Sequence, residues 1–289
     1  MKRAKILLIL IIITSMVCGC FKRDDLEDVE IYTTVYPIEY LTKQLYGYNS
    51  DVKSIYPADA DLSKYKVTNK QKETYAEGAL FVYNGLGDEK EIARDLLNKN
   101  RNLKIIDVSQ GMEYDKGMSE LWLNPSDFLM LANNLKTGLE EYIQNKVIIT
   151  EIEENYNKLK VLISSFDAEL EMSKTTAEDS NILVASDELM FLNKYGFDVT
   201  NIDSSDYEVQ STTESKAKKL VSNGTVKYIY MLDNEKESDL VKELVSDGAK
   251  VIRLSSMTLL TEEEREDNST YETIMRENID NLKKEMFEN

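Results

Sequence analysis

The sequence predicts an α/β protein built from two lobes, each with a mainly parallel sheet flanked by helices, joined by one long helix. Short apolar runs alternate with longer periodic ones, which is typical of strand–helix–strand units. Some runs, such as ALFVYNG at 79–85, are apolar throughout, as expected of a parallel strand covered on both faces. A single long amphipathic stretch separates an earlier series of such units from a later one.

The first series contains four expected strands and four expected helices, and we expect the N-terminal lobe to span 29–144. The strands are Glu30–Val35, Val52–Tyr56, Ala79–Asn84 and Leu103–Val108. The helices are Ile38–Tyr46, Asn69–Glu77, Glu89–Asn98 and 126–143, the last of which follows Pro125, a suitable first-turn residue.

The amphipathic stretch predicts a linking helix over 145–175. Its apolar residues recur at spacings of three and four, at Ile152, Tyr156, Leu159, Ile163, Phe166 and Leu170. A coiled-coil dimer would use the same pattern, but the stripe lasts under three heptads and contains two serines. We therefore expect it to pack within its own chain and the protein to be a monomer.

The second series predicts a C-terminal lobe over 176–289. Its strands are Asn181–Ser186, Phe197–Ile202, Lys227–Leu232 and Lys250–Leu254. Its helices lie near Leu189–Tyr195, Glu214–Asn223, Asp239–Asp247 and Thr270–Phe287. Two lobes on a rigid helix form a cleft, and clefts between domains are where small ligands bind.

The N-terminal sequence is typical of a secretory signal. Three basic residues precede an apolar run at 6–17, which is shorter than the ~20 residues that a membrane-spanning helix needs. The following Val17-Cys18-Gly19-Cys20 resembles the lipobox of bacterial lipoproteins. That resemblance implies that residues 1–19 are removed, that Cys20 carries the lipid, and that 20–28 form a tether on the extracytoplasmic face of the membrane.

Composition excludes several classes of function. The formal net charge of −18 repels nucleic acid. Both cysteines lie in the lipobox, so the folded body has no disulfide. The chain has no histidine, which removes the familiar nucleophile–base pairs, and it has no phosphate-loop motif. We therefore expect a binding protein and not an enzyme.

Several segments resemble the zinc- and manganese-type solute-binding lipoproteins of ABC importers. They are VEIYTTVYPIEYLTKQLYG (29–47), SIYPADADLSKYKVTNKQ (54–71), ALFVYNGLGDE (79–89), ELWLNP (120–125) and YETIMRENIDNLKKEM (271–286). The resemblance covers nearly the whole mature chain. It implies two pseudo-symmetric lobes, a ligand held between them, and two partners, an ABC permease and its ATPase.

The chain departs from this family at the metal ligands, which are usually three histidines and a carboxylate. The resemblance places Ser63 or its neighbour, Glu120 and Ser186 where the family has histidine, with Asp187 directly after the third of these positions. It places Leu232 or Asp233 where the family has the carboxylate. Zinc favours imidazole and thiolate, so a zinc site of the family's type is not available. Oxygen ligands from these residues, with Asp59 or Asp61, would suit manganese, magnesium or calcium.

Three hypotheses for the altered cleft therefore stay open. The cleft binds a divalent cation through oxygen ligands, or it captures a non-metal solute for an importer, with Ser63, Ser186, Asp187 and Glu188 as hydrogen-bonding groups. Alternatively, the protein is a surface interaction module that no longer serves uptake. With 53 acidic residues in the chain, some carboxylates lie near any loop by chance.

Overall fold

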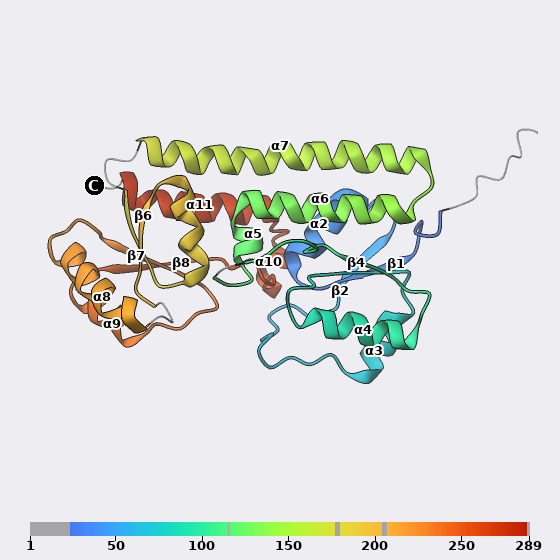
Figure 1. The fold of residues 1–289 in the computed structure, drawn as a ribbon, viewed down its shortest axis with the longest axis horizontal. Coiled ribbons are helices and arrows are strands. Elements are labelled where there is room, and N and C mark those ends of the chain that lie inside the picture. Colours follow the sequence, from blue (N-terminus) through green and yellow to red (C-terminus); the bar gives the residue numbers. More distant parts are fainter. Residues whose placement is uncertain (1–23, 115, 177–179, 204–206, 288–289) are drawn as a thin grey trace, which may run out of the picture.

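Two four-stranded parallel sheets form the framework of the protein (Figure 1). The computed structural model describes residues 24–114, 116–176, 180–203 and 207–287. The first sheet has the order β2-β1-β3-β4, with β1 (Glu30–Thr33), β2 (Asp51–Ser54), β3 (Leu80–Tyr83) and β4 (Lys104–Asp107). The second repeats it as β6-β5-β7-β8, with β5 (Asn181–Val184), β6 (Asp198–Asn201), β7 (Tyr228–Leu232) and β8 (Lys250–Leu254). The predicted fold class, two similar α/β lobes, is confirmed.

Helices cover both faces of each sheet. In the first lobe they are α2 (Tyr36–Tyr46), α3 (Asn69–Ala76), α4 (Glu89–Lys99), α5 (Glu120–Leu123) and α6 (Pro125–Tyr142). In the second they are η1 (Asp187–Tyr195), α8 (Tyr207–Ser222), α9 (Asp239–Ser246), α10 (Glu262–Glu266) and α11 (Tyr271–Phe287). Helix α7 (Lys146–Thr176) runs along both lobes, with α6 and α11 on the same side as α7 and α3, α4, α8 and α9 on the other (Figure 1).

One hydrophobic core continues through both lobes, and each sheet also has a smaller core on its other face. Strand β3 shows why: Leu80 and Val82 face the shared core, whereas Phe81 and Tyr83 face the α3–α4 side. Strand β7 does the same in the second lobe. Side chains alternate along a strand, so a strand that is buried on both faces must be apolar throughout.

Helix α7 buries the predicted stripe. Its residues Ile152, Leu159, Ile163, Phe166 and Leu170 are all at most 4% exposed and belong to the shared core. Because the same helix packs against α6, α2 and α11, it ties the two lobes together. The two lobes are therefore joined by packed side chains as well as by the chain itself.

Local signals mark several helix starts, and weak local signals explain the differences from the prediction. Pro125 opens α6 as predicted, with Asn124 accepting a hydrogen bond from the Ser126 amide. The segment predicted as a helix near 189–195 is 3₁₀. Helix α8 begins at Tyr207, before the predicted Glu214, and the sequence did not indicate its first turns because they contain Ser and Thr, which have low helix propensity. The short α5 and α10 were not predicted, since four or five residues carry no periodicity.

The signal, Cys20 and the first part of the tether lie outside the described residues. Within 24–287, leaving aside the undescribed gaps, no helix is long and apolar enough to cross a membrane.

Candidate functional site

The carboxyl ends of β1 and β8 bring the two lobes into contact. The Tyr36 amide, just beyond β1, donates a hydrogen bond of 2.9 Å to the Thr258 carbonyl, which follows β8. The Trp122 indole N–H donates to the Ser256 carbonyl at 2.7 Å, and the Tyr271 hydroxyl donates to the Trp122 carbonyl at 2.6 Å. Because ligands of parallel α/β sheets bind outside the carboxyl ends of the strands, this junction is the place to look for a site.

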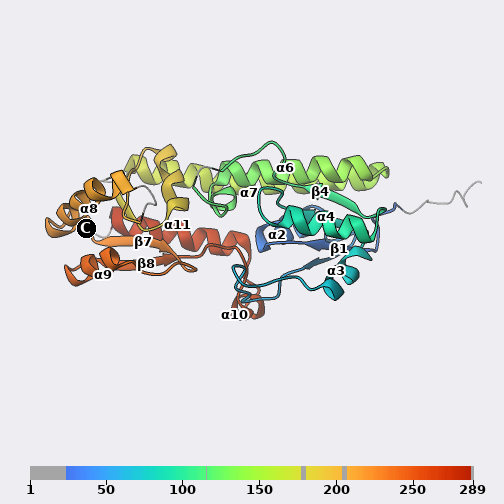
Figure 2. The same ribbon diagram turned by 60° about the horizontal axis from the view of Figure 1, so that its bottom comes forward.

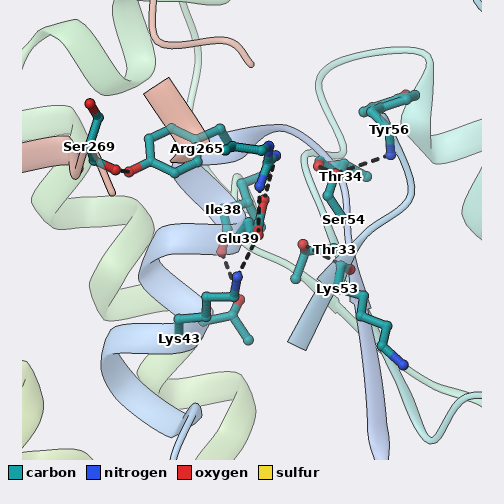
Figure 3. Close-up of polar contacts among 12 residues, drawn as sticks. Thr33, Thr34, Ile38, Glu39, Lys43, Lys53, Ser54, Tyr56, Arg265 and Ser269 are labelled. Carbon is teal, nitrogen blue, oxygen red and sulfur yellow. Dashed lines mark hydrogen bonds and ion pairs between the residues drawn. The ribbon is translucent and has the colours of Figure 1, made fainter. Parts of the chain in front are cut away.

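An ion pair holds α10 of the second lobe against α2 of the first (Figure 3). Glu39 on α2 is only 3% exposed, and its Oε2 lies 3.2 Å from Arg265 Nη2 on α10, while its Oε1 lies 2.6 Å from Lys43 Nζ. Figure 2 shows α10 projecting at the junction between the lobes. The buried carboxylate is thus fully paired, and it serves the contact between lobes instead of a ligand.

A pocket of about 460 Å³ lies at this junction. The first lobe contributes Tyr56 and Glu89, the segment at α5 contributes Ser119 and Trp122, and the second lobe contributes Thr258. The remaining lining residues are Val35, Leu62, Leu86, Gly87, Asp88, Tyr114, Met118 and Asn234. The pocket therefore draws on both lobes and has mostly apolar and aromatic walls, as small-molecule sites usually do.

Glu89 is the buried acid of this pocket. It is 4% exposed at the start of α4, and burial, followed by the nearby Asp88, raises the pKa of its carboxyl to about 7. A Cβ at Gly87 would lie 2.3 Å from Glu89 Oε2 and 2.6 Å from Met118 Cε. The ends of the Glu89 and Met118 side chains therefore both lie close to Gly87, and a larger residue there would displace them.

The first predicted ligand, Ser63, makes its contacts within its own loop. Its amide and hydroxyl both donate to Asp61 Oδ1, at 3.1 and 2.5 Å, and Asp61 Oδ2 pairs with Lys64 at 2.5 Å. Asp59 accepts a hydrogen bond of 3.1 Å from the Glu262 amide, at the start of α10. The Asp59, Asp61 and Ser63 side chains lie on an exposed loop. Among residues 59–64, only Leu62 lines the pocket.

Glu120 begins α5, and its carboxylate turns back along the chain. Its Oε2 accepts from the Lys116 amide at 3.4 Å. The side chain is half-buried, and it is not among the residues that line the inter-lobe pocket. The structure therefore places this candidate beside the pocket without turning it inward.

The remaining candidates lie at the carboxyl ends of the second sheet. Asp187 Oδ1 accepts from Asn201 Nδ2 at 2.6 Å, and Asp233 Oδ1 accepts from the Ser256 amide at 3.1 Å. The Ser186 hydroxyl donates to Glu188 Oε2 at 3.1 Å. In the described part of the chain, no three His, Cys, Asp or Glu side chains are grouped as a metal site would need.

Glu188 and Glu235 form a second set of partly buried acids, next to Ser186. Burial raises the pKa of Glu188, and burial raises the pKa of Glu235 to about 7, with Glu188 and Asp203 adding to the effect. Glu188 packs against Gly117, where a Cβ would lie 2.5 Å from its Cγ. Sequence reasoning missed Glu89 and Glu235, because nothing local distinguishes a buried acid from the many solvated ones.

These features define a two-lobed α/β protein with a ligand-sized pocket between its lobes. The chain belongs to the family described as "Zinc-uptake complex component A periplasmic", whose model matches residues 31–285. The match spans both lobes and the linking helix, and it confirms the resemblance.

Two relatives by sequence have zinc in their names. The chain is 24% identical over 297 residues to the zinc-binding protein AdcA of Streptococcus pyogenes serotype M1, covering 88% of this chain and 55% of AdcA. It therefore spans about half the length of that relative. It is 23% identical over 282 residues to the high-affinity zinc uptake system protein ZnuA of Bacillus subtilis, covering 89% of this chain and 87% of that one.

Solved structures share the fold. The metal-dependent lipoprotein YcdH of Bacillus subtilis superposes with a TM-score of 0.72 at 24% identity, covering 89% of this chain and 98% of that chain. The Zn(II)-bound ZnuA-like domain of Streptococcus pneumoniae AdcA gives 0.71 at 22% identity, covering 90% and 99%.

Proposed function

We propose that this protein is the extracytoplasmic solute-binding component of an ABC importer, a receptor that captures its ligand between the two lobes. The observation that carries the proposal is the family match over 31–285, which includes both lobes and the junction that holds the pocket. Its partners would be an ABC permease and its ATPase. The protein binds and hands over a solute, and it catalyses no reaction.

The receptor would be held at the membrane through a lipid on Cys20. The support is the sequence of the N-terminus, a basic start, a short apolar run and the lipobox-like VCGC at 17–20. Such an anchor keeps a monomeric receptor close to its permease, on the extracytoplasmic face.

Zinc and manganese are the solutes that the family would lead one to expect. The names of two relatives include zinc, yet this chain has no histidine. In the structure, the candidate ligands Asp187 and Asp233 accept hydrogen bonds from Asn201 and from the Ser256 amide. Zinc prefers imidazole and thiolate, whereas manganese accepts carboxylates and carbonyls. If a metal is the ligand, Glu120, Ser186, Asp187 and Asp233 would have to reorient around it.

A thermal-shift screen of the metal-stripped protein tests directly whether the protein binds a metal ion. Each of Zn²⁺, Mn²⁺, Fe²⁺, Mg²⁺ and Ca²⁺ is added to the wild type and to Glu120→Ala, with the exposed Glu91→Gln as a matched control. A cation at 100 times its dissociation constant stabilises the fold by about 2.7 kcal/mol. A shift that Glu120→Ala removes and the control keeps identifies a metal receptor. If no cation shifts the unfolding temperature, the ligand of the receptor is a non-metal solute.

A further inference from the structure

The inter-lobe pocket is much larger than a metal site. Its volume of about 460 Å³ falls within the range of roughly 300–1,000 Å³ that is typical of pockets for small organic molecules. A bare divalent cation is held instead by ligand atoms only about 2.0–2.6 Å away. The space therefore fits an organic solute.

The acid in this pocket lacks a positive partner. The pKa of Glu89 is raised by burial and by the charge of Asp88, and it is lowered by a hydrogen bond from the backbone amide of Glu89 itself. No Lys or Arg among the described residues contributes to it. No ion pair of the described chain includes it either, whereas the equally buried Glu39 has two cations. A buried carboxylate without a counter-charge is costly, so a positive group brought by a ligand would be strongly favoured.

Aromatic rings line the same space. Tyr56, Tyr114 and Trp122 all border the pocket, and they come from three different segments of the chain. Tyr56 shares this lining with Glu89, and burial, followed by the charges of Glu89 and Asp88, raises the pKa of the Tyr56 hydroxyl. Aromatic faces attract organic cations, and they also pack well against an apolar ligand body.

We propose that the inter-lobe pocket binds a small organic cation, whose ammonium group pairs with the Glu89 carboxylate and whose apolar body lies against Tyr56 and Trp122. The second lobe would complete the site through Asn234 and Thr258. The inference rests on the proposed receptor function and names the class of solute. The formal net charge of −18 also favours the approach of a cation.

Calorimetric titration of the full chain, purified in detergent, tests this proposal with matched probes. The ammonium probes are 2-phenylethylammonium, cyclohexylammonium and 1,4-butanediammonium, and their neutral counterparts are 2-phenylethanol, cyclohexanol and 1,4-butanediol. We expect at least one ammonium to bind about tenfold or more tightly than its alcohol, since only the ammonium forms a charge-assisted hydrogen bond with the Glu89 carboxylate.

Two variants and one control locate the binding. Glu89→Gln keeps the shape and should abolish the preference for ammonium, and Tyr56→Leu should weaken binding by removing an aromatic wall. Glu91→Gln changes an acid of the same helix that is exposed and paired with Arg94, and it should bind like the wild type. Thermal unfolding of each variant shows that it is folded.

The outcomes separate this inference from the receptor proposal. Equal binding of an ammonium and its alcohol, ammonium binding that survives Glu89→Gln, or no binding of any ammonium at millimolar concentration overturns the inference. If a divalent cation stabilises the chain while no ammonium does, the inference fails and the receptor role stands. If deleting the gene changes the uptake of no solute, the receptor role itself fails.

Discussion

Replacing Glu89 by glutamine should stabilise the unliganded protein, and by an amount that depends on pH. Burial raises the pKa of this carboxyl from its ordinary 4.5 to about 7. The folded state therefore holds the proton more tightly than the unfolded state, so the wild type loses stability as pH rises from about 4.5 through 7. Each unit of pKa difference corresponds to about 1.36 kcal/mol, so the wild type loses about 3 kcal/mol of unfolding free energy above pH 7. A glutamine at position 89 does not ionise and does not have this loss.

Urea denaturation at pH 4.5 and pH 8.5 measures the effect. At pH 4.5 the carboxyl is largely protonated in the fold, so Glu89→Gln and the wild type should be nearly equal. At pH 8.5 the variant should be more stable by up to about 3 kcal/mol. Glu91→Gln, at an exposed position, should show no comparable change between the two pH values. A difference of the same size at both pH values would refute the reasoning.

Three further substitutions test how the lobes are joined, each by urea denaturation. Arg265→Met leaves Glu39 buried with one cation fewer and should destabilise the fold by about 1–3 kcal/mol; an unchanged midpoint would contradict that pairing. Trp122→Phe removes the indole donor to the Ser256 carbonyl and should cost about 1–3 kcal/mol, and a neutral result would show that the bond contributes nothing. Phe166→Ala empties the shared core beneath α7 and should cost about 3–5 kcal/mol, so a loss below 1 kcal/mol would argue against a continuous core.

The strands and the long helix could be read from the sequence because their signals are local. Leu80 to Tyr83 are apolar without interruption, as a strand covered on both faces must be, and the structure buries all four. The stripe from Ile152 to Leu170 repeats at helical spacing, and those residues form the inner face of α7. Periodicity and continuous apolar runs depend only on neighbours in the chain.

The site was harder to predict because burial of a polar group depends on distant parts of the chain. Glu89 and Glu91 look alike in sequence, yet the first is 4% exposed in the pocket and the second is a solvated partner of Arg94. The resemblance pointed to Ser63 and Asp187, but Asp61 and Asn201 hold these side chains. The folded arrangement of each side chain and its neighbours distinguishes such cases.

Solute uptake by cells tests the central claim most directly. A strain lacking the gene is compared with the same strain carrying the wild-type gene, and the cellular content of divalent metals and of amines is measured by mass spectrometry. The receptor account predicts that the accumulation of one solute falls in the deletion strain and is restored by the wild-type gene. Unchanged accumulation of every solute, together with altered adhesion or envelope integrity, would contradict it and favour a surface interaction module.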